Sequence, residues 1–213
     1  EDVLRAQRDE VHAVLLPSLP RPLLAAAADA LGMAQGGELV HTGTRQLAIC
    51  ADLALYGLPE GRELLAAYVS RRLGVDPVLR EAMPAATHQL FQAGTADPHG
   101  AILCTPVRGE APFFLYDPQL RHPSMVGVFV SAYVIALPGM HITTGAPLVI
   151  HPDIVEKVRG RTDLQDASLA ASLARTQWTY TAPHASGSSR RPSKNGSCPC
   201  GSGRRYKSCH GKR

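Results

Sequence analysis

Residues 126–139, VGVFVSAYVIALPG, are the stretch that decides the fold of this chain. β-branched and aromatic side chains dominate it and the pair Pro138–Gly139 ends it, a pattern that predicts a β-strand followed by a turn. A transmembrane helix needs about 20 apolar residues, whereas this run is shorter and contains Ser131. We therefore expect a strand that is buried in a protein core.

Shorter stretches of the same kind lie on both sides of it. They are GAILCTPV (100–107), PFFLYD (112–117) and PLVI (147–150), each bounded by Gly, Pro or Asp. Together with 126–139 they predict a small antiparallel meander of three or four strands. MHITTG (140–145) is expected to form a turn whose hydroxyl groups cap the backbone.

The chain before residue 95 has a helical pattern instead. Apolar residues recur at three- and four-residue spacing in the segments 5–16, 21–33, 45–57, 59–73 and 76–94. Gly32 and Gly57 are predicted helix stops, and Pro84 is expected to kink or split the last segment. Helical patterns return at 153–158 and 163–178. Helices first and strands second predict an α+β fold.

The chain has 213 residues, enough for one domain and a small appendage. We expect a globular body over 1–178, a flexible basic linker over 179–194 and a small module over 195–213. Residues 1–166 carry 18 acidic and 13 basic residues, a balance of −5, whereas 167–213 carry 9 basic residues and no acidic one. A basic tail on an acidic body indicates an acidic partner, unless the tail serves only solubility.

Cysteine usage indicates a reducing compartment. The five cysteines are an odd number, and Cys50 and Cys104 lie in apolar stretches. Because the sequence shows no secretory signal, we expect a cytoplasmic protein. The chain begins at Glu1, which leaves open whether a targeting segment precedes it.

Three cysteines and a histidine gather near the end of the chain, in SCPCGSGRRYKSCHG (197–211). Cys198, Cys200, Cys209 and His210 offer four sulfur and nitrogen donors, the set that tetrahedral zinc prefers, although iron fits the same ligands. Because all four donors come from protein, the predicted site is structural rather than catalytic. The alternative is that these thiols are reactive or form a disulfide.

This segment resembles the SEC-C motif, the metal-binding tail best known from the SecA preprotein translocase ATPase. The resemblance is carried by Cys198–Pro199–Cys200–Gly201–Ser202–Gly203, Tyr206–Lys207 and Cys209–His210–Gly211. It implies one zinc ion and docking onto an acidic macromolecular surface, either the ribosome and its RNA or a chaperone such as SecB. Acidic lipid is a further partner of such tails, so a membrane is not ruled out. No G-x-x-x-x-G-K-[ST] phosphate loop accompanies the motif, so ATPase activity is not implied.

Basic and aromatic side chains between the second and third cysteines are the expected partner contacts. They are Arg204, Arg205, Tyr206 and Lys207. Two stretches of the body, 47–69 and 139–150, resemble bacterial proteins that carry such a tail after a helical and β-rich body. This second resemblance implies no activity.

The body shows no recognisable catalytic signature. Cys104 is a candidate nucleophile with His88, His99 or His122 as its base, but a cysteine in AILCTPV is more often a core residue. His141, Thr143 and Thr144 are candidates for anion binding. Asp117 is predicted to be a turn residue, and Arg71 and Arg72 are predicted to complement the end of a helix.

We therefore predict a non-enzymatic zinc-binding adaptor that docks through its tail. The alternative is an enzyme, for example a hydrolase, that the zinc tail only localises. Its site would use Cys104, His141 and Thr144.

Overall fold

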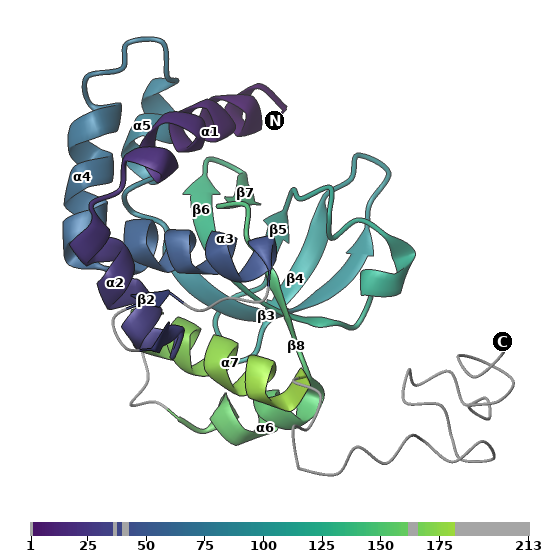
Figure 1. The fold of residues 1–213 in the computed structure, drawn as a ribbon. Coiled ribbons are helices and arrows are strands. Elements are labelled where there is room, and N and C mark those ends of the chain that lie inside the picture. Colours follow the sequence, from purple (N-terminus) through teal and green to yellow (C-terminus); the bar gives the residue numbers. More distant parts are fainter. Residues whose placement is uncertain (1, 36–37, 40–42, 162–165, 182–213) are drawn as a thin grey trace, which may run out of the picture. The chain divides into compact units, whose positions relative to one another are not determined.

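The computed structural model describes residues 2–35, 38–39, 43–161 and 166–181 (Figure 1). Contacts within the chain divide it into two units, Glu1–Tyr180 and Thr181–Arg213. The second unit lies almost wholly outside the described residues. The predicted linker and the predicted module therefore remain predictions.

Helices form the first part of the body, as the sequence predicts. They are α1 (Asp2–Leu15), η1 (Leu16–Ser18), α2 (Arg21–Ala30), α3 (Thr44–Asp52), the π-helix η2 (Leu53–Gly57), α4 (Pro59–Val69) and α5 (Pro77–Ala82). Proline stands in the first turn of α2, α4 and α5, where the missing N–H costs no helical hydrogen bond. Gly32 follows α2 with a φ of 67°, a left-handed conformation that ends the helix. Between α2 and α3, the short strands β1 (Ala34–Gln35) and β2 (Glu38–Leu39) pair with each other.

Six further strands form one mixed sheet. They are β3 (Thr87–Ala96), β4 (Ile102–Pro106), β5 (Phe113–Leu115), β6 (Phe129–Leu137), β7 (Met140–Thr143) and β8 (Leu148–Ile150), with the 3-10 turn η3 (Pro123–Met125) before β6. The order is β3-β4-β5-β7-β6-β8, and β3 also pairs with β6, so five strands close into a small barrel. Because β6 returns to lie beside β3, the connection is a Greek key. Five-stranded Greek-key barrels are typical of the OB fold, an architecture that serves many functions and identifies none.

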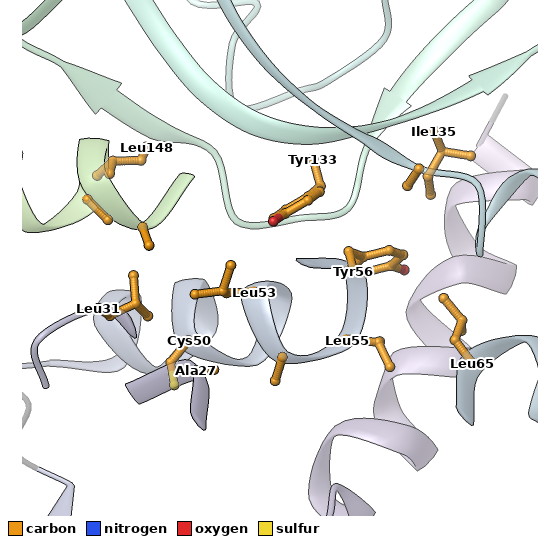
Figure 2. Packing of buried hydrophobic residues seen from close by; sticks show 14 of the residues in the cluster. Ala27, Leu31, Cys50, Leu53, Leu55, Tyr56, Leu65, Tyr133, Ile135 and Leu148 are labelled. Atoms are coloured by element: carbon orange, nitrogen blue, oxygen red, sulfur yellow. The ribbon is translucent and has the colours of Figure 1, made fainter. Parts of the chain in front are cut away.

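Successive residues of β6 point into two different cores. Val130, Ala132 and Val134 lie in the interior of the barrel. Tyr133 and Ile135 point the other way, into the core between the barrel and the helices, where Tyr133 lies near Tyr56 (Figure 2). Burial on both faces explains why this stretch is apolar almost without interruption.

The α+β class and the order of helices before strands are confirmed, but two elements differ from the prediction. Residues 87–94 belong to the strand β3 and not to a helix, because they pair with β6 along their whole length up to Gln92. The predicted turn at 140–145 contains the strand β7. The predicted antiparallel meander is also too simple, since β5 and β7 pair in parallel.

Two helices complete the body, as predicted. They are α6 (Pro152–Arg159) and α7 (Asp166–Thr181). The ring Nδ1 of His151 accepts a hydrogen bond from the Asp153 N–H at 3.3 Å and caps the start of α6. Among the described helices, none alone has the length and apolarity to cross a membrane; α1 with η1 and α2 would qualify only as a pair, bent by 99°.

Candidate functional site

The strongest predicted site, the four metal ligands Cys198, Cys200, Cys209 and His210, lies outside the described residues. The predicted partner contacts Arg204, Arg205, Tyr206 and Lys207 lie outside them as well. Within the part of the chain that the structure describes, no group of three or more His, Cys, Asp or Glu side chains could hold a metal ion.

The described body does contain a buried polar network, located where the helices meet the barrel. Thr144 Oγ1 donates a hydrogen bond to Asp52 Oδ2 at the end of α3. The adjacent Thr143 Oγ1 donates to Asp117 Oδ2, in the turn after β5. Arg8 Nη1 on α1 donates to the Thr143 carbonyl at 2.5 Å. This end of β7 is thus tied to α1, to α3 and to the β5 turn by groups that are shielded from water.

A row of contacting rings, formed by His12, Tyr56, Tyr133 and His88, continues this network through the same interface. His12 Nε2 lies 2.6 Å from the Tyr56 hydroxyl, and the Tyr56 ring stacks on Tyr133 with centroids 6.0 Å apart. Tyr133 meets His88 edge to face at 5.4 Å, and His88 Nε2 lies 2.8 Å from Ser131 Oγ. Figure 2 shows Tyr133 and Tyr56 facing each other across the boundary between barrel and helices.

Burial shifts the pKa values of Asp52, His12 and His88 in this interface. Desolvation raises the pKa of Asp52 to about 6, against the lowering effect of the Thr144 hydrogen bond and of the Arg8 charge. Desolvation also lowers the pKa of His12 to about 4 and that of His88 to about 3, with the Arg8 and Arg108 charges acting in the same direction. Both imidazoles are therefore neutral at pH 7.

A small cavity lies within this interface and is lined by Asp52, His88, Ser131 and Tyr133 among others. Its volume is about 20 Å³, which matches one water molecule and no larger ligand. His88 Nδ1 is buried and has no hydrogen-bond partner among the described residues. The network therefore resembles a structural core more than a substrate site, because a cavity of this volume has no room for a substrate.

The residues of the predicted hydrolase site are not brought together. Cys104 is fully buried inside the barrel, where desolvation raises the pKa of its thiol to about 12. His141 Nδ1 lies 3.2 Å from the Phe114 carbonyl, and the Thr144 hydroxyl is bonded to Asp52. A thiol in this state is a poor nucleophile, and the prediction that Cys104 is a core residue is confirmed.

The remaining candidates have structural roles or are exposed. Asp117 Oδ1 accepts the Gln119 N–H at 2.8 Å, which confirms it as a turn residue. His122 caps η3 through Nδ1, and His99 is exposed in the turn between β3 and β4. Arg71 and Arg72 are exposed just beyond the end of α4.

Sequence reasoning missed Arg8 and Asp52, the buried partners of the end of β7, and His12, the partner of Tyr56. Asp52 had a signal, because it is the one charged residue in the apolar run LAICADLALYG (47–57). A buried charge needs a partner, and here the partner comes from a residue 92 positions away.

Comparison with known proteins bears on the tail. Residues 195–212 match the family model of the SEC-C motif. This match confirms the motif predicted from the cysteine spacing, and it supports metal binding by this segment. The chain matches no curated protein and no solved structure.

Proposed function

We propose that this protein is a zinc-binding adaptor that docks onto an acidic macromolecular surface through its C-terminal SEC-C segment. The observation that carries the proposal is the family match over residues 195–212, which contains all four predicted ligands. Three thiolates and an imidazole suit zinc, and a segment with almost no apolar side chains needs the metal to fold. Cys198, Cys200, Cys209 and His210 would hold the ion.

The charge distribution supports an acidic partner. Residues 182–213, which follow the last helix of the body, carry 8 basic residues and no acidic one. Arg204, Arg205 and Lys207 lie between the metal ligands, so metal binding would fix their positions relative to one another. The ribosome with its RNA and a SecB-like chaperone are the two partners that this chemistry fits.

Thiol titration of the full chain tests the metal site. We expect about one zinc per chain by elemental analysis and no fast-reacting thiol in the zinc-loaded protein. A chelator should release three fast-reacting thiols, whereas Cys50 and Cys104 are buried and should react only after denaturation. A Cys198→Ser, Cys200→Ser variant should lose the zinc, and a Ser202→Ala, Ser208→Ala variant is the matched control. Zinc retained by the cysteine variant would contradict the proposed ligands.

Affinity capture from cell lysate tests the docking role. Ribosomal proteins or a chaperone should accompany the intact chain and the serine control, and should be absent with the cysteine variant. If RNA phosphates are the target, affinity should fall steeply with salt, because each neutralised phosphate releases counterion. A complex that salt leaves unchanged would point to the chaperone instead. Equal capture by all three chains would refute the adaptor role of the tail.

A further inference from the structure

The connection between α4 and α5 displays an apolar side chain on a turn that is firmly held. Gln7 of α1 donates from Nε2 to the Gly74 carbonyl at 3.3 Å and accepts the Asp76 N–H through Oε1 at 2.9 Å. Val75 between them is buried, and its N–H donates to the Arg72 carbonyl at 3.1 Å. The turn therefore has a fixed conformation, anchored to α1 on both sides of Val75.

Leu73 stands on this turn and is 89% exposed, the highest value among the exposed large hydrophobic residues of the described chain. Looseness does not explain this exposure, because the next residues are clamped by Gln7. In Figure 1 the α4–α5 connection projects beyond the helical layer, at the end of the body away from α6 and α7. Leu73 is thus accessible to a partner that contacts the projecting turn.

Two arginines precede the leucine directly. Arg71 and Arg72 are exposed, and neither forms an ion pair within the described residues. The Arg72 guanidinium lies over the Tyr68 ring, 4.7 Å from its centroid, which orients the charge without neutralising it. Two cations that form no ion pair within the described residues therefore stand next to an exposed apolar tip.

A groove opens beside these arginines, between the end of α1 and α4. Its volume is about 390 Å³, and it is lined by Leu15, Leu64, Ala67 and Tyr68 together with Arg71 and Arg72. No carboxylate is among the described residues that line it. Ser18 completes the lining, so the charged groups of the rim are cationic and the floor is mostly apolar. Such a groove matches a ligand that has an anionic group next to hydrocarbon.

We propose that the α4–α5 turn docks the body onto the surface of an anionic lipid bilayer. Leu73 would enter the boundary between headgroups and acyl chains, and Arg71 and Arg72 would contact lipid phosphates, as in peripheral proteins that combine a basic patch with an apolar anchor. A bilayer is favoured over a protein partner because the apolar tip protrudes from the surface. The proposal rests on residues of the body alone and is independent of the tail's metal and its partner.

Vesicle co-sedimentation of the full chain tests this proposal. The vesicles would be phosphatidylcholine alone or phosphatidylcholine with about 30% phosphatidylglycerol, whose headgroups give the surface a negative potential. We expect binding to the anionic vesicles only. Arg71→Gln with Arg72→Gln should weaken it roughly 30-fold, because each basic residue near such a surface contributes about five-fold. Leu73→Ser should weaken it by about ten-fold.

Matched control variants distinguish the contribution of this turn to vesicle binding from that of charge and exposed leucine elsewhere in the chain. Lys157→Gln with Arg159→Gln removes two charges from α6, at the other end of the body in Figure 1. Leu103→Ser removes an exposed leucine from the barrel. Both controls should bind the anionic vesicles as the unchanged chain does. Turn variants that bind as well as the controls would overturn the proposal, whatever the tail binds.

A spectroscopic variant gives a second readout that does not depend on weak affinity. Leu73→Trp places an indole on the turn, in addition to the single native tryptophan, Trp178. Anionic vesicles should shift its emission to the blue, and neutral vesicles should not. An emission spectrum that anionic vesicles leave unchanged would overturn the proposal. It would also be overturned if the unchanged chain formed a dimer without lipid and the Leu73→Ser variant were a monomer, because Leu73 would then serve a protein contact.

Discussion

At the scale of single residues, the buried histidines make stability depend on pH. The folded-state pKa values of His12 and His88 are lowered to about 4 and about 3, from 6.5. Their stabilising contribution is therefore complete above pH 6.5 and is lost as the pH falls toward these lower values. Between pH 4 and 6, each histidine lowers the free energy of unfolding by about 1.4 kcal/mol per pH unit of acidification.

Asp52 acts in the opposite direction. Its folded-state pKa is raised to about 6 from 3.8, so its contribution is complete below pH 3.8 and is lost as the pH rises through 6. Between pH 4 and 6, the folded protein holds a proton on Asp52 that the unfolded protein lacks, whereas the unfolded protein holds one proton on each histidine that the folded protein lacks. The Asp52 proton therefore cancels the effect of one histidine on the pH slope. Replacing His88 with Gln should therefore reduce the pH slope of the free energy of unfolding by about 1.4 kcal/mol per unit.

Urea denaturation at several pH values between 4.5 and 6 measures this slope. Gln keeps a hydrogen-bonding group near Ser131 and does not titrate. Thr105→Val, a change at an exposed position of β4 that removes no titratable group, should leave the slope as it is. The assignment of His88 would fail if its replacement left the slope unaltered.

The hydrogen bond between Thr144 and Asp52 allows a second prediction at this scale. Thr144→Val keeps the shape of the side chain but removes the hydroxyl donor from a fully buried carboxylate. We expect a loss of about 1–3 kcal/mol in the free energy of unfolding at pH 7.5. The loss should be smaller at pH 4.5, where the carboxyl group is protonated. Thr105→Val, at an exposed position of β4, is the control, and an equal loss for both variants would contradict the role of Thr144.

At the scale of elements, the contact between α4 and the π-helix η2 depends on a glycine. A Cβ added at Gly61 would lie 1.9 Å from the Ala54 carbonyl oxygen, so the two helices pack closer than any side chain allows. Gly61→Ala should therefore force the helices apart and cost about 1–3 kcal/mol or more. Thermal unfolding of this variant gives the measurement.

Gly160→Ala is the matched control for this change. Gly160 follows α6 with a φ of −90°, and nothing lies within 4 Å of an added Cβ. We expect its effect to stay within about 0.5 kcal/mol. A Gly61→Ala protein as stable as this control would show that α4 and η2 are not in close contact.

The elements also show how far local sequence patterns determine the fold. The helices were predictable because proline and glycine mark their ends, as Pro59 and Gly32 do. The strand β3 was missed because its residues 87–94, THQLFQAG, contain no strong turn signal, and a short apolar run does not distinguish helix from strand. Its pairing with β6 and the parallel pairing of β5 with β7 join distant segments, which local periodicity does not encode.

Some residues of the candidate sites were predictable from the sequence and others were not. The cysteine spacing of the tail was sufficient to predict the SEC-C motif, because the ligands lie close together in the sequence. The network around β7 was not predictable, since Asp52 and Thr144 meet only after the barrel and the helices pack together. Cys104 could be predicted as a core residue because its neighbours are apolar.

At the scale of the whole molecule, the body has its own means of staying folded. The body has two hydrophobic cores of its own, one inside the barrel and one between the barrel and the helices. Its charge is also opposite in sign to that of the tail. The stability of the body is thus expected to be independent of the metal that we propose for the tail.

This separation makes a prediction about metal removal and truncation. A chain ending at Thr181 retains all described helices and strands and both cores, so it should unfold within about 2 °C of the full chain. A shift of that size corresponds to about 0.5–1 kcal/mol for a body of this length. Adding a chelator to the full chain should also leave the unfolding midpoint unchanged, even as it removes the metal that we propose for the tail. Scanning calorimetry of both proteins, with and without chelator, provides the measurement. A chelator-dependent fall in the midpoint of the full chain would instead show that the metal stabilises the body.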